Sequence, residues 1–230
     1  MIISHKHKFA FFRAPKTGTT TAQFMLRMSN VWDESTDILT QSIGHFESVN
    51  EPSHRNDPEV HGTHSHTTPA IAIRHGLITL EQLREYDCYC FLREPYSRYL
   101  SASVHLVGRF STPNNIHALM ENTLVGHELH PKARAALSIV NRHQIDYFFV
   151  DGEQVVEALN FADYTNECRR LLKQVGSIEF PVIPKMNVRP AWKKDFTYEE
   201  FWTDNIKTKF AVDYADDIAF YNKMLDIWNK

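Results

Sequence analysis

Short apolar runs alternate with segments of helical periodicity along the chain. The runs at 8–13, 88–92 and 145–150 have the length and composition of buried strands. Periodic segments and helix-start signals predict helices at 19–28, from Thr79, from Pro95, at 132–142, at 164–175 and after Thr197. The stretch at 33–56 is polar and shows no clear period.

Several details of the predicted helices follow from residue spacing. Thr79 with Gln82, and Thr197 with Glu200, have the spacing of a capping box at a helix start. In the helix at 164–175, Leu171 and Leu172 are expected to face inward. Near the C-terminus, four apolar residues fall at helical spacing on one face: Phe210, Tyr214, Ile218 and Tyr221.

The alternation of strands and helices predicts an α/β fold. Its parallel sheet would be covered by helices, and a ligand crevice would lie at the carboxyl ends of the strands. With 230 residues, 43% of them hydrophobic, the chain can bury a substantial core. Since we find no repeat, low-complexity segment or linker, we predict one domain over residues 1–230.

The first predicted strand runs into a turn that has the features of an anion-binding loop. Pro15, Lys16 and Gly18 follow the strand, and the next helix is predicted to begin at Thr19. The first N–H groups of such a helix, together with its dipole, attract phosphate or sulfate. Lys16 adds a full charge, and hydroxyl donors come from Thr17, Thr19, Thr20 and Thr21.

Two other interpretations of this loop are open. Gly and Thr are common at any junction between a strand and a helix, because Thr caps helices and Gly relieves strain. A Walker A loop needs the order G-x-x-x-x-G-K-[ST], whereas Lys16 precedes Gly18 here and no glycine lies upstream. An ordinary nucleoside triphosphate loop is therefore a poor match.

A second junction of the same kind follows the strand predicted at 88–92. Arg93 comes directly after the apolar run, at the strand end where open α/β sheets place ligands. Pro95 suits the first turn of a helix, and Ser101 lies two turns along. Arg98 on the same helix is expected to be a packing or salt-bridge residue.

Together, P-K-T-G-T-T-T at 15–21 and R-E-P-Y-S-R-Y-L-S-A at 93–102 resemble the paired cofactor motifs of sulfotransferases that use 3′-phosphoadenosine 5′-phosphosulfate (PAPS). The closest resemblance is to the carbohydrate type, which includes heparan sulfate 2-O-sulfotransferases. It implies a sulfotransferase fold with a P-loop-like parallel sheet. It also implies an enzyme that moves a sulfuryl group in line to an acceptor hydroxyl, of a carbohydrate or of another small or glycan substrate.

The resemblance also implies roles for individual residues. Arg93 and Ser101 would hold the 3′-phosphate of the donor. Lys16 would in addition stabilise charge on the bridging oxygen that leaves with adenosine 3′,5′-bisphosphate. The loop that would hold the 5′-phosphosulfate consists of Lys16, Thr17, Gly18, Thr19, Thr20 and Thr21.

Between the two motifs lies a histidine pair, His64 and His66, which matches an H-x-H segment of the resembled family. The resemblance implies a catalytic role for the pair, with His66 as the general base. An unperturbed histidine pKa of about 6.5 suits that role. Zinc is an alternative, since His61 extends the pattern to H-x-x-H-x-H, but no cysteine or carboxylate cluster offers a fourth ligand. The chain has 13 histidines, so a surface location is a third interpretation. We expect no metal cofactor.

Net charge and hydropathy narrow the classes of partner. A formal charge of −3 provides no global basic field, so we expect no nucleic acid partner, and a polyanionic acceptor would need a local basic patch. The N-terminal residues lack a long apolar region, and no later segment approaches a membrane span. With three cysteines and no indicated disulfide framework, we expect a cytoplasmic setting. Animal carbohydrate sulfotransferases are instead anchored in the Golgi.

Two alternative functions are open at this stage. A P-loop-like kinase or phosphotransferase would share the fold and the anion loop but lacks the expected Gly-Lys-Thr/Ser order. A module that binds a nucleotide or a sulfated glycan without catalysis would keep the same motifs. No motif in the segments at 33–56 and 112–131 identifies an acceptor, and no pattern indicates an oligomeric state.

Overall fold

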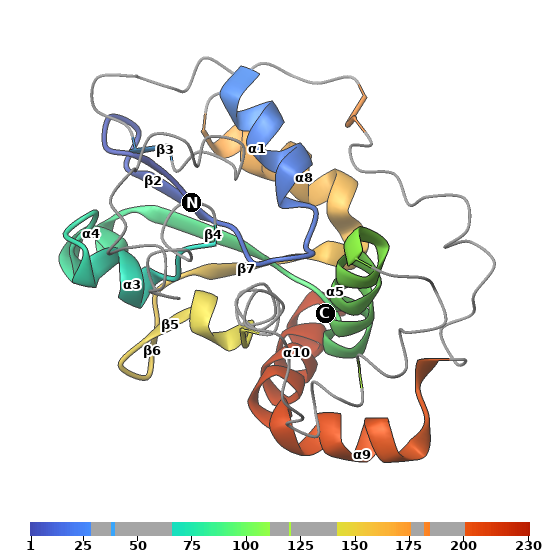
Figure 1. Ribbon diagram of the computed structural model, residues 1–230. Coiled ribbons are helices and arrows are strands. Elements are labelled where there is room, and N and C mark those ends of the chain that lie inside the picture. The colour runs from blue at the N-terminus through green and yellow to red at the C-terminus, as the bar shows by residue number, and fades with distance from the viewer. Residues whose placement is uncertain (29–37, 40–65, 111–119, 121–141, 176–181, 185–200) are drawn as a thin grey trace. The chain divides into compact units, whose positions relative to one another are not determined.

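The computed structural model of the protein describes residues 1–28, 38–39, 66–110, 120, 142–175, 182–184 and 201–230 (Figure 1). The chain divides into two compact units. The first comprises Met1–Leu92 and Gln144–Met186, and the second comprises Arg93–His143 and Asn187–Lys230. A single domain over residues 1–230 stays a prediction.

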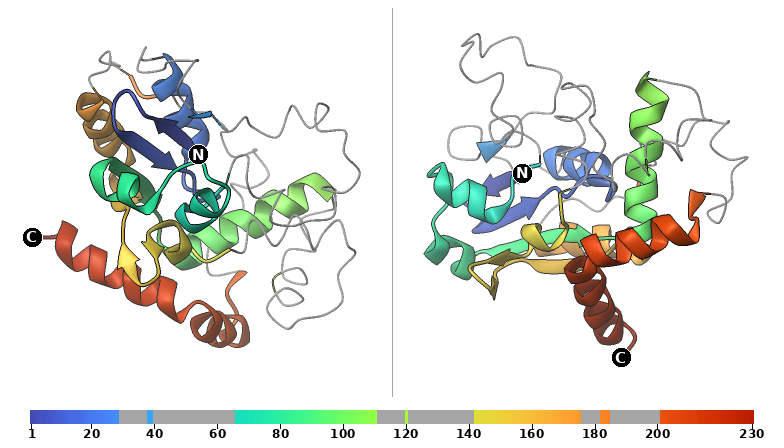
Figure 2. Two further views of the ribbon diagram at one scale, coloured as in Figure 1. Left: turned by 90° about the vertical axis from the view of Figure 1, so that its left-hand side faces the viewer. Right: turned by 60° about the horizontal axis from the view of Figure 1, so that its bottom comes forward.

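The first unit is built on a five-stranded sheet in the order β3-β1-β2-β4-β7. Strand β4 (Asp87–Leu92) pairs in parallel with β2 (Phe9–Phe12) and with the edge strand β7 (Glu157–Asn160), as Figures 1 and 2 show. Strand β1 (Ile2–Ser4) pairs antiparallel with β2 on one side and with β3 (Ile38–Leu39) on the other. The predicted α/β class with a parallel sheet is thus confirmed as a mixed α/β fold with a mainly parallel sheet.

Strands β1 and β3 were not predicted from the sequence. Only four residues separate β1 from β2, and a connection that short can join antiparallel neighbours but not parallel ones. Lys8 in this turn has a φ of 48°.

Helices α1 (Thr19–Met28) and α8 (Tyr164–Gln174) pack side by side on one face of this sheet (Figure 1). The cluster beneath them takes apolar side chains from both helices and from four strands. It includes Leu171 and Leu172, which confirms their predicted inward orientation. The cluster includes Tyr89 and Phe91, whereas Cys88 and Cys90 alternate to the other side of β4.

On that other side lie α3 (Pro69–Arg74) and α4 (Leu80–Glu85) (Figure 1). The Cys88 thiol contacts the carbonyl of Leu83 in α4 at 3.6 Å. The capping box predicted at Thr79 is confirmed, because the Gln82 N–H donates to the Thr79 hydroxyl and the Thr79 N–H donates to the Gln82 side chain. All three cysteines are buried, and none of them forms a disulfide.

Most of the predicted elements in this unit are confirmed within one residue. The helix at 19–28 has the predicted bounds, β2 lies inside the predicted 8–13, β4 begins one residue early, and α8 ends one residue early. The helix predicted at 132–142 and the capping box at Thr197 lie outside the described residues.

The strand predicted at 145–150 is largely wrong. Residues Ile145–Tyr147 form the 3₁₀ turn η4, and only β5 (Phe149–Val150) is extended. That strand pairs with β6 (Glu153–Gln154) in a separate two-stranded sheet. The third parallel strand is instead β7, a four-residue segment too short and too polar to stand out in the sequence.

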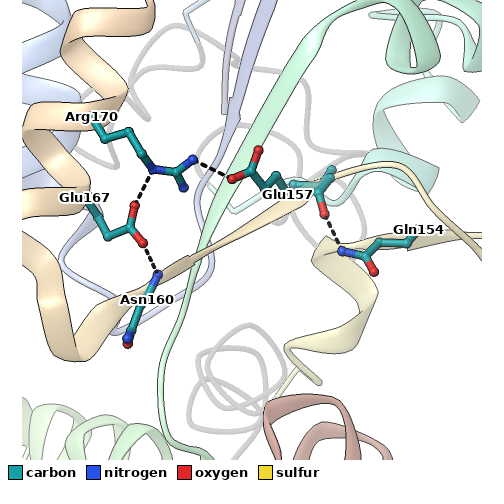
Figure 3. Close-up of polar contacts among 6 residues, drawn as sticks. Gln154, Glu157, Asn160, Glu167 and Arg170 are labelled. Atoms are coloured by element: carbon teal, nitrogen blue, oxygen red, sulfur yellow. Dashed lines mark hydrogen bonds and ion pairs between the residues drawn. The ribbon is translucent and has the colours of Figure 1, made fainter. Parts of the chain in front are cut away.

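A polar network ties β7 to α8 (Figure 3). Arg170 of α8 donates to Glu157 of β7 and to Glu167, both at 2.7 Å. Glu167 in turn accepts the N–H of Asn160, the last residue of β7, at 3.2 Å. Exposed ion pairs contribute little stability individually. Together, these contacts link α8 to both ends of β7. At the other end of β7, Gln154 donates to the Val156 carbonyl.

The second unit contains α5 (Pro95–Phe110), α9 (Asp204–Asp213) and α10 (Ala215–Trp228). Its core is rich in aromatic residues, and the rings of Phe210 and Tyr214 stack with centroids 4.4 Å apart. The packing role predicted near the C-terminus is confirmed for three of the four residues, although they lie on two helices that meet at Tyr214, α9 and α10. Phe210, Tyr214 and Ile218 join the core, whereas Tyr221 contacts Trp228.

Arg98 has the predicted salt-bridge role inside this unit. Its side chain is 1% exposed, and Nη2 lies 3.8 Å from Oδ2 of Asp217, which is 0% exposed. The same nitrogen donates to the Arg142 carbonyl at 2.9 Å. None of the helices in the described parts of either unit is long and apolar enough to cross a membrane.

The buried ion pair leads to a stability prediction. Asp217→Asn should lower the free energy of unfolding by about 3 to 5 kcal/mol, because it leaves the Arg98 charge buried without its counter-ion. Urea-induced unfolding followed by circular dichroism measures this change.

The matched control is Glu153→Gln, which removes the partner of Arg84 in an exposed pair with a 2.6 Å contact. Solvent already screens that pair, so the control should change stability little. Equal losses in the two variants would contradict the prediction.

Candidate functional site

The loop between β2 and α1 is closed by a hydrogen bond from one of its side chains to its own backbone. The Thr17 hydroxyl donates to the Ala14 carbonyl at 2.8 Å, and the Thr17 side chain is fully buried. Lys16 has a φ of 67°, an uncommon conformation for a residue with a side chain. Such backbone strain occurs preferentially where a protein binds ligands or catalyses reactions.

The start of α1 lacks the side-chain cap that three other described helices have. Helices α3, α4 and α9 are capped by the side chains of Thr68, Thr79 and Thr203. The residue before α1 is Gly18, which has no side chain to accept an N–H. The Gly18 carbonyl accepts hydrogen bonds from the N–H of Thr21 at 3.1 Å and the N–H of Ala22 at 3.4 Å. Because Gly18 has no side chain, no side chain at the cap position covers the first N–H groups of α1.

Gly18 is also required by its surroundings. Its φ is 73°, and a Cβ added there would lie 2.6 Å from a ring carbon of Tyr164. The Tyr164 hydroxyl donates to the Gly18 carbonyl at 2.7 Å. Any side chain at position 18 would therefore strain the backbone and displace the tyrosine.

The threonine hydroxyls are not equivalent. Thr17, Thr19 and Thr21 are buried and Thr20 is exposed. All four were predicted to donate to an anion, but the Thr17 hydroxyl instead donates to the Ala14 carbonyl and so closes the loop.

Arg13 is the residue that the sequence analysis missed. It directly follows β2 and is only 4% exposed, yet Nε and Nη1 have no hydrogen-bond partner within the described parts of the chain. Burial lowers the pKa of its guanidinium to about 10, because the charged form loses solvation. The only signal in the sequence was its position as the last residue before the loop. A buried, unpaired cation next to a helix start favours an anion as the missing partner.

His66 lies against the same strand end. Its Nδ1 is 2.6 Å from the Arg13 carbonyl. Because a carbonyl oxygen only accepts, Nδ1 must carry the hydrogen, and the neutral ring then has its lone pair on Nε2. The backbone of His66 is held in turn, since the buried Tyr147 hydroxyl donates to the His66 carbonyl at 2.9 Å. His64 and His61 lie outside the described residues.

The second motif begins where β4 ends, since Arg93 follows Leu92 in the chain. Within the second unit, Arg93 donates to the Ser97 hydroxyl through Nε at 3.1 Å and Nη2 at 2.7 Å. Pro95 occupies the first position of α5, as predicted, and the Glu94 carboxylate caps that helix through Tyr96 N and Ser97 N. Ser101 is half-buried on α5. Ser97, which orients Arg93, was not predicted.

Comparison with known families decides what these two segments belong to. The model of a sulfotransferase family matches residues 1–134, more than half of the chain. The chain belongs to the sulfotransferase family. The matched range contains the loop after β2, His66 and the Arg93 segment. Searches of curated proteins and of solved structures found no match.

Membership of the sulfotransferase family makes the protein a transferase that moves a sulfuryl group to an acceptor. Within the described ranges, no group of three or more His, Cys, Asp or Glu side chains is arranged to hold a metal ion. Because His61 and His64 fall outside those ranges, the zinc alternative stays a hypothesis.

The contact between Gly18 and Tyr164 gives a testable stability difference. Gly18→Ala should destabilise the protein through both backbone strain and overpacking, by about 2 to 4 kcal/mol. Gly76→Ala is the control, because Gly76 has a φ of 66° and nothing within 4 Å of an added Cβ. It should cost about 1 kcal/mol, from backbone strain alone. Equal losses in urea unfolding would show that the ring contact carries no energy.

The unpaired charge of Arg13 gives a second prediction, with the opposite sign. Arg13→Met should raise the free energy of unfolding in anion-free buffer by about 1 to 3 kcal/mol, because an apolar side chain needs no counter-charge. The same variant should gain less stability than wild type when inorganic sulfate is added. Thermal unfolding with and without sulfate measures both effects, and a destabilised variant would contradict the argument.

Proposed function

We propose that the protein transfers the sulfuryl group of PAPS to a hydroxyl of a carbohydrate acceptor. The observation that carries this proposal is the loop after β2, where Gly18 in place of a side-chain cap, the buried Arg13 charge and the His66 ring come together. Its family supports sulfuryl transfer in general. The donor and the carbohydrate acceptor follow from the resemblance of the two motifs to those of carbohydrate sulfotransferases.

The residues of the loop fit the phosphosulfate end of the donor, which supplies an activated sulfuryl group. The segment from Lys16 to Thr21 would act as a P-loop-like cradle, with N–H groups at the start of α1 as donors. Lys16 would neutralise the charge that develops on the bridging oxygen. Arg13 would bring a second cation, and the unpaired Nε and Nη1 groups of that side chain are consistent with an anionic ligand.

Arg93 and Ser101 would bind the 3′-phosphate. Arg93 directly follows β4 in the chain, as Arg13 directly follows β2. Ser97 holds the guanidinium by two hydrogen bonds, which limits the rotamers of Arg93 before any ligand binds.

His66 would act as the general base. The acceptor hydroxyl would give its proton to Nε2 as its oxygen attacks sulfur, while Nδ1 keeps its hydrogen on the Arg13 carbonyl. The resulting imidazolium donates at both nitrogens, so its contact with Arg13 strengthens as the charge forms.

Binding and transfer assays test the proposal. Isothermal titration calorimetry should show that adenosine 3′,5′-bisphosphate binds more tightly than ATP. Radiolabelled sulfate should then move from the donor to candidate sugars. Tighter binding of ATP would favour a kinase, and nucleotide binding without transfer to any acceptor would favour a binding module.

The base assignment has its own test. His66→Ala should lower kcat by about 10²- to 10⁴-fold and abolish the acid limb of the pH–rate profile, because that limb reports protonation of the base. His75→Ala, at an exposed histidine of the same unit, is the control and should leave both unchanged. An acid limb that persists in His66→Ala would transfer the role to another group.

A further inference from the structure

Tyr164 approaches the anion loop from a distant part of the chain. It is the first residue of α8, which follows β7 through the short turn η5 (Phe161–Asp163). It lies 146 residues beyond Gly18 in sequence, yet its hydroxyl donates to the Gly18 carbonyl at 2.7 Å. Tyr164 falls outside the range that matches the sulfotransferase family, so membership assigns it no role.

The tyrosine is itself held firmly. The centroid of its ring lies 4.7 Å from that of Phe91 on β4 and 5.6 Å from that of Phe161, with the last two rings in a T-shaped arrangement. The polar contacts of Arg170 and Glu167 also connect α8 to the end of β7 (Figure 3). Burial raises the pKa of the Tyr164 hydroxyl, which therefore stays protonated and able to donate.

The hydrogen bond from the Tyr164 hydroxyl to the Gly18 carbonyl controls the direction of the Thr19 N–H group. In a trans peptide the C=O and the N–H point in opposite directions. The Gly18 carbonyl is directed toward Tyr164 and toward Thr21 N, so the N–H of Thr19 points away from them, out of the start of α1. That direction is the one from which an anion approaches a helix N-terminus.

We infer that Tyr164 is a positioning residue for the 5′-phosphate end of the donor. It holds the Gly18–Thr19 peptide so that its N–H is preorganised for the anion, while its ring excludes any side chain at position 18. This inference rests on the proposed function. It adds to the site a residue that touches neither the donor nor the acceptor and acts only through the loop.

The test compares two ligands that differ only at the loop end. Adenosine 3′,5′-bisphosphate carries the 5′-phosphate, and adenosine 3′-monophosphate lacks it. Tyr164→Phe should weaken the bisphosphate by about 3- to 10-fold, the effect of one hydrogen bond, and leave the monophosphate unchanged. Isothermal titration calorimetry measures both affinities, and urea unfolding of the free protein shows that the variant is folded.

Tyr89→Phe is the matched control, because Tyr89 is buried in the same apolar cluster as Phe91 and should affect neither ligand. Unchanged bisphosphate affinity in Tyr164→Phe would overturn the inference, and so would an equal loss for both ligands, which indicates a general structural role. If wild type failed to bind the bisphosphate, the proposed function would fall, and this inference with it. Wild-type binding with an unaffected variant would overturn the inference alone.

Discussion

Parallel pairing of β2, β4 and β7 is the constraint on which the candidate site depends. Parallel strands end at the same edge of a sheet, so the segments that follow them start close together. Within the first unit, Arg13 and the loop come after β2, and the turn to Tyr164 comes after β7. Parallel neighbours need long crossover connections. Helix α1 lies in the connection from β2 to β4, α8 follows β7, and the two helices cover one face of the sheet. The strands therefore fix the core and the place of the proposed anion loop.

The loop after β2 combines three features that are each uncommon. Helices α3, α4 and α9 are capped by threonine side chains, whereas the residue before α1 is Gly18. Lys16 has a positive φ, and the buried Arg13 side chain has two nitrogen atoms without a hydrogen-bond partner among the described residues. An anion bound here, as proposed, would offset the cost of burying the Arg13 charge. The occurrence of these features within six residues supports the proposed anion-binding loop.

The same strand end also prepares the proposed base. The Arg13 carbonyl determines which nitrogen of His66 carries the hydrogen, and Tyr147 holds the histidine backbone. In the proposed reaction, the Arg13 side chain would bind the anion while its carbonyl holds the base. Although the whole chain carries a formal charge of −3, Arg13 and Lys16 place two positive charges within four residues after β2. Local placement of charge, rather than net charge, suits an anionic donor.

The sequence by itself determined the features that depend on a few neighbouring residues. These are the bounds of α1, the capping box at Thr79, Pro95 at the start of α5, and the two motifs that indicate a sulfotransferase. Only the tertiary structure decided that the polar segment of β7 completes the sheet while the apolar residues at 145–147 form a turn. It also decided the burial of Arg13, the tautomer of His66 and the contact between Tyr164 and Gly18. The physical reason is range: periodicity and capping act within about four residues, whereas these contacts join residues 53 to 146 positions apart and leave no local pattern.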